Sequence, residues 1–198
     1  MTISKKDFID EIMPFQPCSN GIELIESCKD MTEVFKKMDG GYWRWLLINR
    51  PQFKDTCEKY KGFEKMGGWD WVFLLETQPQ YADTCKKYKG FEKMNGRSWV
   101  SLLKYQTQYK DTCEKYNGFE KMDGWDWGTL LENQPQLVNT CKKYNGFEKM
   151  DGSDWRWLLD RQPQFADTCE KYKGFKKMDG YDWRWLLETQ PQLEKYRR

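Results

Sequence analysis

The sequence predicts an all-α protein, an α-solenoid of tandem two-helix repeats with a divergent N-terminal cap. Three observations lead to this prediction: one motif returns every 28 residues, each copy contains two short helical patterns, and helices this short are unstable alone. Each repeat must therefore be held by its neighbours, as in a stacked array. The motif is anchored on a tryptophan that recurs as Trp43, Trp71, Trp99, Trp127, Trp155 and Trp183.

The first helix of each repeat begins near this tryptophan. Trp71, Leu74, Leu75 and Gln78 stand at positions i, i+3, i+4 and i+7, which form one stripe along a helix. Asp70 precedes the stripe, and aspartate is a favourable N-cap residue. We therefore expect a short amphipathic helix with Asp70 as its N-cap.

The second helix begins at Pro79, because proline suits the first position of a helix. Tyr81, Cys85 and Tyr88 then form its apolar face, and Gly90 is placed to end it as a C′ residue. Residues 91–96 are too few for another long element. We expect them to form a connector whose phenylalanine and methionine fill the gap between repeats.

The two ends of the chain depart from the repeat. Residues 1–34 follow the pattern loosely, and we expect them to form an N-terminal helical cap. Residues 35–198 are predicted to form one continuous solenoid, with the last repeat stopping inside its second helix at "QPQLEKYRR", which is either a polar C-terminal cap or a truncation.

The composition bears on compartment and partner. The 33 Lys+Arg and 31 Asp+Glu residues leave a net charge of only +2, which is a weak electrostatic argument for nucleic acid. No apolar run has the length of a signal peptide or a membrane span. The expectation is a folded cytoplasmic protein without a membrane partner.

The cysteines are interpreted as buried free thiols. Five of the seven recur at the repeat period, and stacked helices lie too far apart for a disulfide between equivalent positions. Two others, Cys18 and Cys28, lie outside the array and their state stays open. The five are Cys57, Cys85, Cys113, Cys141 and Cys169.

Several kinds of chemistry lack a sequence signal. The chain has no histidine, no C-x-x-C pair and no glycine-rich phosphate loop. Carboxylates such as Asp83 and Asp111 recur in several repeats, whereas an active site is normally single. We therefore expect no enzymatic activity, catalytic residue, metal, cofactor or small-molecule substrate.

Charges also repeat. The residue after the periodic cysteine alternates between glutamate and lysine, from Glu58 and Lys86 onward, which would pair opposite charges along the stack. One position further on, a lysine is present in every copy. That lysine series is either a ladder for phosphates or a solvated helix face: Lys59, Lys87, Lys115, Lys143 and Lys171.

Positions that differ between nearly identical copies indicate where a partner would bind. One such position lies at the entrance to the first helix and carries Trp69, Arg97, Trp125 and Tyr181. Aromatic and arginine side chains are typical of binding hot spots. The second set follows the anchor tryptophan: Arg44, Trp45, Phe73, Arg156, Trp157, Arg184 and Trp185. Its aromatic members either pack against the next repeat or form a recognition strip, and both interpretations stay open.

The motif "WRWLLDRQPQFADTC", from Trp155 to Cys169, resembles a short tandem repeat of uncharacterised bacterial and mobile-element proteins. The resemblance covers about residues 35 to 193 and implies no particular activity. Gln106-Thr107 and Ser98 depart from the pattern in one repeat.

Two functions remain as hypotheses. The first is a repeat scaffold that binds another protein as an adaptor or as an inhibitor, for example one that blocks a host defence complex. The second is binding of single-stranded RNA or DNA, with bases stacked on Trp69, Trp125 or Tyr181 and phosphates held by Arg44, Arg97, Arg156 and Arg184.

Overall fold

The computed structural model describes residues 3–197, and these form an all-α repeat solenoid of α-helices and short 3₁₀ turns without a strand. Its contacts divide the chain into two compact units, Met1–Lys93 and Met94–Arg198. Each unit is described by itself below. The predicted boundary between a cap at 1–34 and an array at 35–198 stays a prediction.

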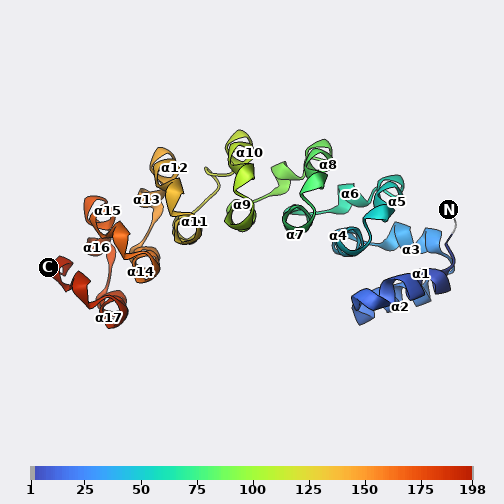
Figure 1. Ribbon diagram of the computed structural model, residues 1–198, viewed down its shortest axis with the longest axis horizontal. Helices are drawn as coiled ribbons and strands as arrows, with labels where there is room; N and C mark the ends of the chain where they lie inside the picture. The colour runs from blue at the N-terminus through green and yellow to red at the C-terminus, as the bar shows by residue number, and fades with distance from the viewer. Residues whose placement is uncertain (1–2, 198) are drawn as a thin grey trace. The chain divides into compact units, whose positions relative to one another are not determined.

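The first unit contains the N-terminal helices and two repeats (Figure 1). Phe8 on its first helix meets Phe35 and Phe53 edge to face, at centroid distances of 5.7 and 5.5 Å, so the N-terminal helices share a core with the repeats. The α-helices are α1 (Lys5–Ile12), α2 (Ser19–Ser27), α3 (Met31–Lys37), α4 (Gly40–Asn49), α5 (Lys54–Lys59), α6 (Gly62–Lys65), α7 (Gly68–Thr77) and α8 (Ala82–Lys87); the 3₁₀ turns are η1 (Met13–Phe15), η2 (Pro51–Phe53), η3 (Pro79–Tyr81) and η4 (Phe91–Lys93).

The second unit contains the remaining repeats. In Figure 1 its first helices, α11, α14 and α17, lie along one edge, and the second helices α12 and α15 lie along the other. The elements are α9 (Gly96–Tyr105), η5 (Thr107–Tyr109), α10 (Lys110–Lys115), α11 (Gly124–Asn133), η6 (Pro135–Leu137), α12 (Val138–Lys143), α13 (Gly146–Lys149), α14 (Gly152–Arg161), η7 (Pro163–Phe165), α15 (Ala166–Lys171), α16 (Gly174–Lys177), α17 (Gly180–Thr189) and η8 (Pro191–Tyr196).

The first helix of a repeat begins three residues before the predicted position. In α7 the N-cap is Gly67, and the carboxylate of Asp70 accepts a hydrogen bond from the Gly67 N–H at 3.0 Å. The prediction of Asp70 as the N-cap is therefore wrong, because Asp70 is the third helical residue. In α11 the cap is Asp123, which accepts from the Asp126 N–H at 2.8 Å, while Asp126 accepts from the Asp123 N–H. This reciprocal capping box fixes the start of the helix.

The second helix also differs in detail from its prediction. Pro79 opens the 3₁₀ turn η3 that leads into α8, so the segment is a turn followed by a short α-helix. The left-handed residue that ends it is Lys89, with φ of 56°, and not Gly90. The glycine serves close packing instead: a Cβ atom at Gly90 would lie 2.5 Å from the Cys85 sulfur and 2.7 Å from the Trp71 indole.

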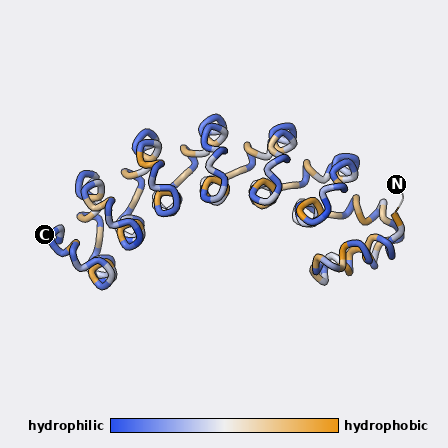
Figure 2. Tube along the Cα trace, in the orientation of Figure 1, coloured by the Kyte–Doolittle hydropathy of each residue, from blue (hydrophilic) through white to orange (hydrophobic). Residues whose placement is uncertain are grey.

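The core between repeats is aromatic. The connector phenylalanine of one repeat stacks on the anchor tryptophan of the next, as Phe63 does on Trp71 at 5.7 Å and Phe147 on Trp155 at 5.5 Å. The connector methionine, such as Met66, is buried as well, which confirms the prediction that these residues fill the gap. Figure 2 shows hydrophobic residues on the connectors and on the adjoining sides of the helices, while the outer sides of α12 and α15 are hydrophilic.

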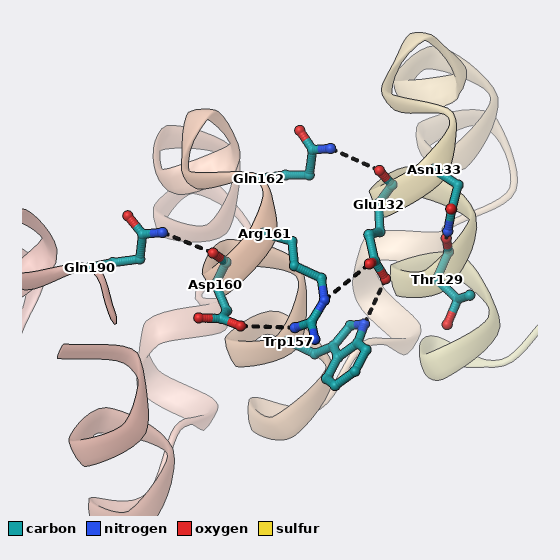
Figure 3. Close-up of polar contacts among 8 residues, drawn as sticks. All are labelled: Thr129, Glu132, Asn133, Trp157, Asp160, Arg161, Gln162 and Gln190. Atoms are coloured by element: carbon teal, nitrogen blue, oxygen red, sulfur yellow. Dashed lines mark hydrogen bonds and ion pairs between the residues drawn. The ribbon is translucent and has the colours of Figure 1, made fainter. Parts of the chain in front are cut away.

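Two series of polar contacts join successive repeats through the main chain. A connector lysine donates to the preceding connector, as Lys149 Nζ does to the Met122 carbonyl at 2.8 Å. A glutamine at the end of the first helix donates to the preceding first helix, as Gln162 Nε2 does to the Glu132 carbonyl at 2.7 Å (Figure 3). Equivalent contacts are made by Lys65, Lys93, Lys121 and Lys177 and by Gln78, Gln134 and Gln190.

The predicted pairing of alternate charges is off by one position. Glu58 pairs with Lys87 and accepts from the Tyr88 hydroxyl at 2.9 Å, and Glu114 pairs with Lys143. The partner is therefore the second residue after the cysteine, and not the first. These lysine contacts lower the pKa of both glutamates. All four side chains are exposed, so the pairs contribute little to stability.

Candidate binding surface on the first helices

The two variable positions of a repeat lie on the same side of the first helix. The entrance residue and the second residue after the anchor tryptophan are four positions apart, and residues at i and i+4 are neighbours on a helix. Trp69 accordingly contacts Phe73 at a centroid distance of 6.0 Å, and Tyr181 contacts Trp185 at 5.9 Å. The two predicted sets therefore form one face in each unit, which we call the variable face.

Much of this face is open to solvent. The exposed fraction is 43% for Trp69, 41% for Phe73, 40% for Trp125, 63% for Tyr181 and 47% for Trp185. Large aromatic side chains exposed together on a folded protein are typical of interaction sites.

In the first unit, the variable face is held together by a cation. The Arg44 guanidinium lies 4.9 Å from the centroid of the Phe73 ring, and its Nε is 3.7 Å from the Asp70 carboxylate. Trp45 is half-buried and, with Arg44 and Tyr42, lines an apolar pocket of about 400 Å³ between the N-terminal helices and α4. Trp45 thus takes part in packing of the cap.

In the second unit, Trp157 joins two repeats. Its ring lies 5.1 Å from that of Trp125, and its indole N–H donates to Glu132 at 2.9 Å. The Arg161 guanidinium stacks over the Trp157 ring at 3.4 Å and pairs with Glu132 at 3.0 Å and with Asp160 at 2.8 Å (Figure 3). Trp157 is therefore oriented by charged neighbours on both repeats.

Glu132, Asp160 and Arg161 are site residues that the sequence pattern alone does not identify. Spacing offered one signal, because Arg161 lies four residues after Trp157 on the same helix face. The contact with Glu132 depends on how α11 and α14 pack, which the sequence pattern does not specify.

The arginines of the variable face differ in their partners. Arg156 pairs with the buried Asp182 at 3.2 Å, and Arg184 lies 3.5 Å from Glu188 on its own helix. Arg97 is exposed and forms no ion pair within residues 3–197. Positive charge on this face is thus largely balanced by neighbouring carboxylates.

The second set divides between packing and exposure, and the packed members contact the preceding element instead of the next repeat, as Trp157 does with Trp125 and Glu132. Trp45 and Trp157 are half-buried and pack against neighbouring elements, whereas Phe73 and Trp185 remain exposed. The lysine series is similarly divided: Lys87 and Lys143 are engaged by glutamates of the preceding repeat. Lys87 and Lys143 would therefore not be free to bind phosphates in a ladder.

Within the described residues, the structure contains no cluster of three or more His, Cys, Asp or Glu side chains that could hold a metal ion. Over the same residues, none of the helices has the length and apolarity needed to cross a bilayer. The seven cysteines are free thiols; Cys18 is exposed and the other six are buried. Burial raises the pKa of the five periodic thiols, among them Cys57 and Cys141.

The fold and the variable face define an all-α repeat solenoid with an exposed aromatic surface. Comparisons with protein families, with curated proteins and with solved structures find no match for this chain.

Proposed function

We propose that this chain is a non-enzymatic scaffold that binds another protein through the variable face. The observation that carries the proposal is the exposure of Trp69, Phe73, Trp125, Tyr181 and Trp185 on the first helices, where copies of one repeat differ from each other. Exposed aromatic side chains of this kind supply a large contact area in protein interfaces.

Preorganisation of the face also supports this proposal. Trp157 is fixed by Trp125, Glu132 and Arg161 before any partner arrives. A side chain that is already ordered loses less conformational entropy on binding. A binder of this design acts by occupying a surface of its partner, either as an adaptor or as an inhibitor. The resemblance to mobile-element proteins makes a complex of host defence a reasonable class of target.

Binding of single-stranded RNA or DNA is the weaker alternative. Its proposed phosphate contacts include Arg44 and Arg156, and both already face carboxylates, Asp70 and Asp182. The net charge of +2 gives no compensating attraction. The exposed Trp69, Trp125 and Tyr181 are the features that this alternative shares with the main proposal.

A pull-down from a lysate of the source organism, with and without nuclease, tests the function. The baits are the wild-type chain, the variant Trp69→Ala/Trp125→Ala/Tyr181→Ala, and a control variant on the second helices, Lys86→Ala/Lys142→Ala. We expect the wild-type and control baits to capture the same protein with and without nuclease, and the aromatic variant to fail to capture it. Loss of all captured protein after nuclease, or equal capture by the three baits, would contradict the proposal.

A further inference from the structure

The variable face of the second unit contains a groove between α9 and α11. Its volume is about 240 Å³, and its walls include Arg97, Lys104, Tyr105, Trp125 and Thr129. Trp125 and Tyr105 are 40% and 64% exposed, so two aromatic rings border an open depression.

The groove is open because two copies of the repeat lack a large side chain. At the second position after the anchor tryptophan, α9 has Ser101 and α11 has Thr129, whereas α14 has Trp157 and α17 has Trp185. Between α11 and α14 the same space is occupied by the Trp157 ring and the Arg161 guanidinium. The shape of the groove therefore follows from Ser101 and Thr129.

The charge of the groove is also distinct. Two positions that are acidic in most other copies are not acidic in α9: Ser98 replaces the aspartate of the first turn, and Lys104 replaces the acidic residue near the end. Arg97 stands at the entrance of the same helix. Neither Arg97 nor Lys104 forms an ion pair within the described part of the chain.

The carboxylates near this groove are already engaged. Asp126 is one of the lining residues, but it is only 4% exposed, and its carboxylate accepts a hydrogen bond from the Asp123 N–H at 3.3 Å and interacts electrostatically with Arg97 from beneath the groove. Glu132 on α11 is bound by Trp157 and Arg161 of the next repeat. Two cations thus border the groove, and the remaining acid is buried beneath it.

We propose that this groove binds an aspartate or glutamate side chain of the protein partner, together with the apolar residue beside it in an extended segment. Arg97 and Lys104 would receive the carboxylate, because neither cation forms an ion pair within the described residues. Trp125 and Tyr105 would cover the apolar neighbour. A polyphosphate chain fits less well, since the cations on the adjoining first helices are paired, as in Arg156 with Asp182. This inference rests on the proposed function and specifies the chemistry of the partner.

Synthetic octapeptide libraries test the inference without a known partner. One library carries a central Asp or Glu between randomised apolar residues, a second carries Asn or Gln there, and a third carries Lys. A (dT)12 oligonucleotide serves as the nucleic-acid probe. Binding is followed by fluorescence anisotropy at low and at moderate salt. Circular dichroism melting confirms that each variant is folded.

We expect wild-type protein to prefer the acidic library over the amide library by about tenfold, equivalent to ~1.4 kcal/mol. Arg97→Glu/Lys104→Glu should reverse this order in favour of the lysine library. The control Lys115→Glu/Lys142→Glu changes the net charge equally on α10 and α12 and should keep the acidic preference. Because the groove variant and the control change the net charge equally, an acidic preference that is lost only in the groove variant locates the site.

Several results would overturn the inference. They are equal binding of the acidic and amide libraries, no binding of either, an acidic preference that survives in Arg97→Glu/Lys104→Glu, or tighter binding of (dT)12 than of every peptide. The proposed function is decided separately by the pull-down. If the aromatic variant loses the partner while Arg97→Glu/Lys104→Glu retains it, the binding function stands and the groove assignment fails.

Discussion

Trp125 and Trp157 come from successive repeats, and their rings contact each other at 5.1 Å with an interplanar angle of 45°. This contact differs from that of the anchor tryptophans, which are buried in the core, five of them completely and Trp183 with 7% exposure. Trp125 retains 40% of its exposure and Trp157 is half-buried. The chain therefore contains two classes of tryptophan that differ in burial, one in the core and one on the variable face.

The first prediction separates these two classes by stability. Trp69→Ala/Trp125→Ala/Tyr181→Ala should unfold at nearly the denaturant concentration of the wild type, because sister repeats already carry Gly41 and Ser153 at this position. Trp127→Ala should lower the free energy of unfolding by about 3–5 kcal/mol, since it removes a fully buried indole. Equilibrium denaturation followed by circular dichroism measures both. A triple variant as unstable as Trp127→Ala would assign the exposed aromatics to the core.

The second prediction concerns thiol reactivity. In the native state an aromatic disulfide reagent should modify Cys18 rapidly, because Cys18 is exposed. The buried Cys28 and the periodic thiols should react slowly, since burial lowers access and, for the periodic thiols such as Cys85, also raises the pKa and suppresses the thiolate. Absorbance at neutral pH gives the number of fast sites, and denaturant should release the rest. Rapid reaction of the periodic thiols would contradict their burial. In the control variant Cys18→Ser the fast phase should be absent.

The third prediction contrasts two adjacent residues at the end of α8. Gly90→Ala should cost about 1–3 kcal/mol, because a Cβ atom would overlap the Cys85 sulfur and the Trp71 ring. Lys89→Gly should be tolerated or slightly stabilising, since it removes the roughly 1–2 kcal/mol penalty of a left-handed non-glycine residue. Paired denaturation curves provide the measurement. Little or no destabilisation by Gly90→Ala would show that close packing does not require glycine at this position.

The fourth prediction uses the pH dependence of stability. Burial raises the pKa of the Asp126 and Asp154 carboxyls above their ordinary value of 3.8. The native state then holds these protons more tightly than the unfolded chain does. The free energy of unfolding of the protein therefore decreases as pH rises from 3.8 through the raised pKa of these carboxyls. Asparagine keeps an acceptor but does not titrate.

The stability of Asp126→Asn relative to the wild type should therefore increase between about pH 3.5 and pH 7. Denaturation at several pH values measures the difference. Asp83→Asn, at an exposed position of α8, is the matched control and should show no such trend. If the stability of Asp126→Asn relative to the wild type fell as pH rises, the unfavourable burial of the Asp126 carboxylate would be contradicted.

The sequence predicts the architecture well because the period and the anchor tryptophan are explicit in it. It places the N-cap of α7 incorrectly because the aspartate of the capping box, Asp70, is a residue type usual at the N-cap, whereas the cap itself is Gly67, and only hydrogen-bond geometry distinguishes their roles. The wrong role predicted for Gly90 has a similar cause. Glycine serves both left-handed turns and close contacts, and here Lys89 takes the turn.

The candidate site is predictable to a smaller degree. Variation between copies identifies Trp69, Trp125 and Tyr181 as exposed side chains, and the structure exposes all three. The contact of Trp125 with Trp157 joins residues on different helices, so it depends on a packing angle that periodicity does not contain. The groove beside α9 depends on the small residues Ser101 and Thr129, which carry no signal of a binding site in the sequence.

The glutamine and lysine contacts between repeats end on main-chain carbonyl oxygens, as in Gln162 to Glu132 and Lys149 to Met122. Every amino acid supplies the same carbonyl, so these joints do not require a particular side chain in the neighbour. If recombination in the gene adds or removes a whole 28-residue repeat, the repeats that become neighbours can still form these hydrogen bonds. The number of repeats and the side chains on their surface can then change independently of the contacts that join the repeats.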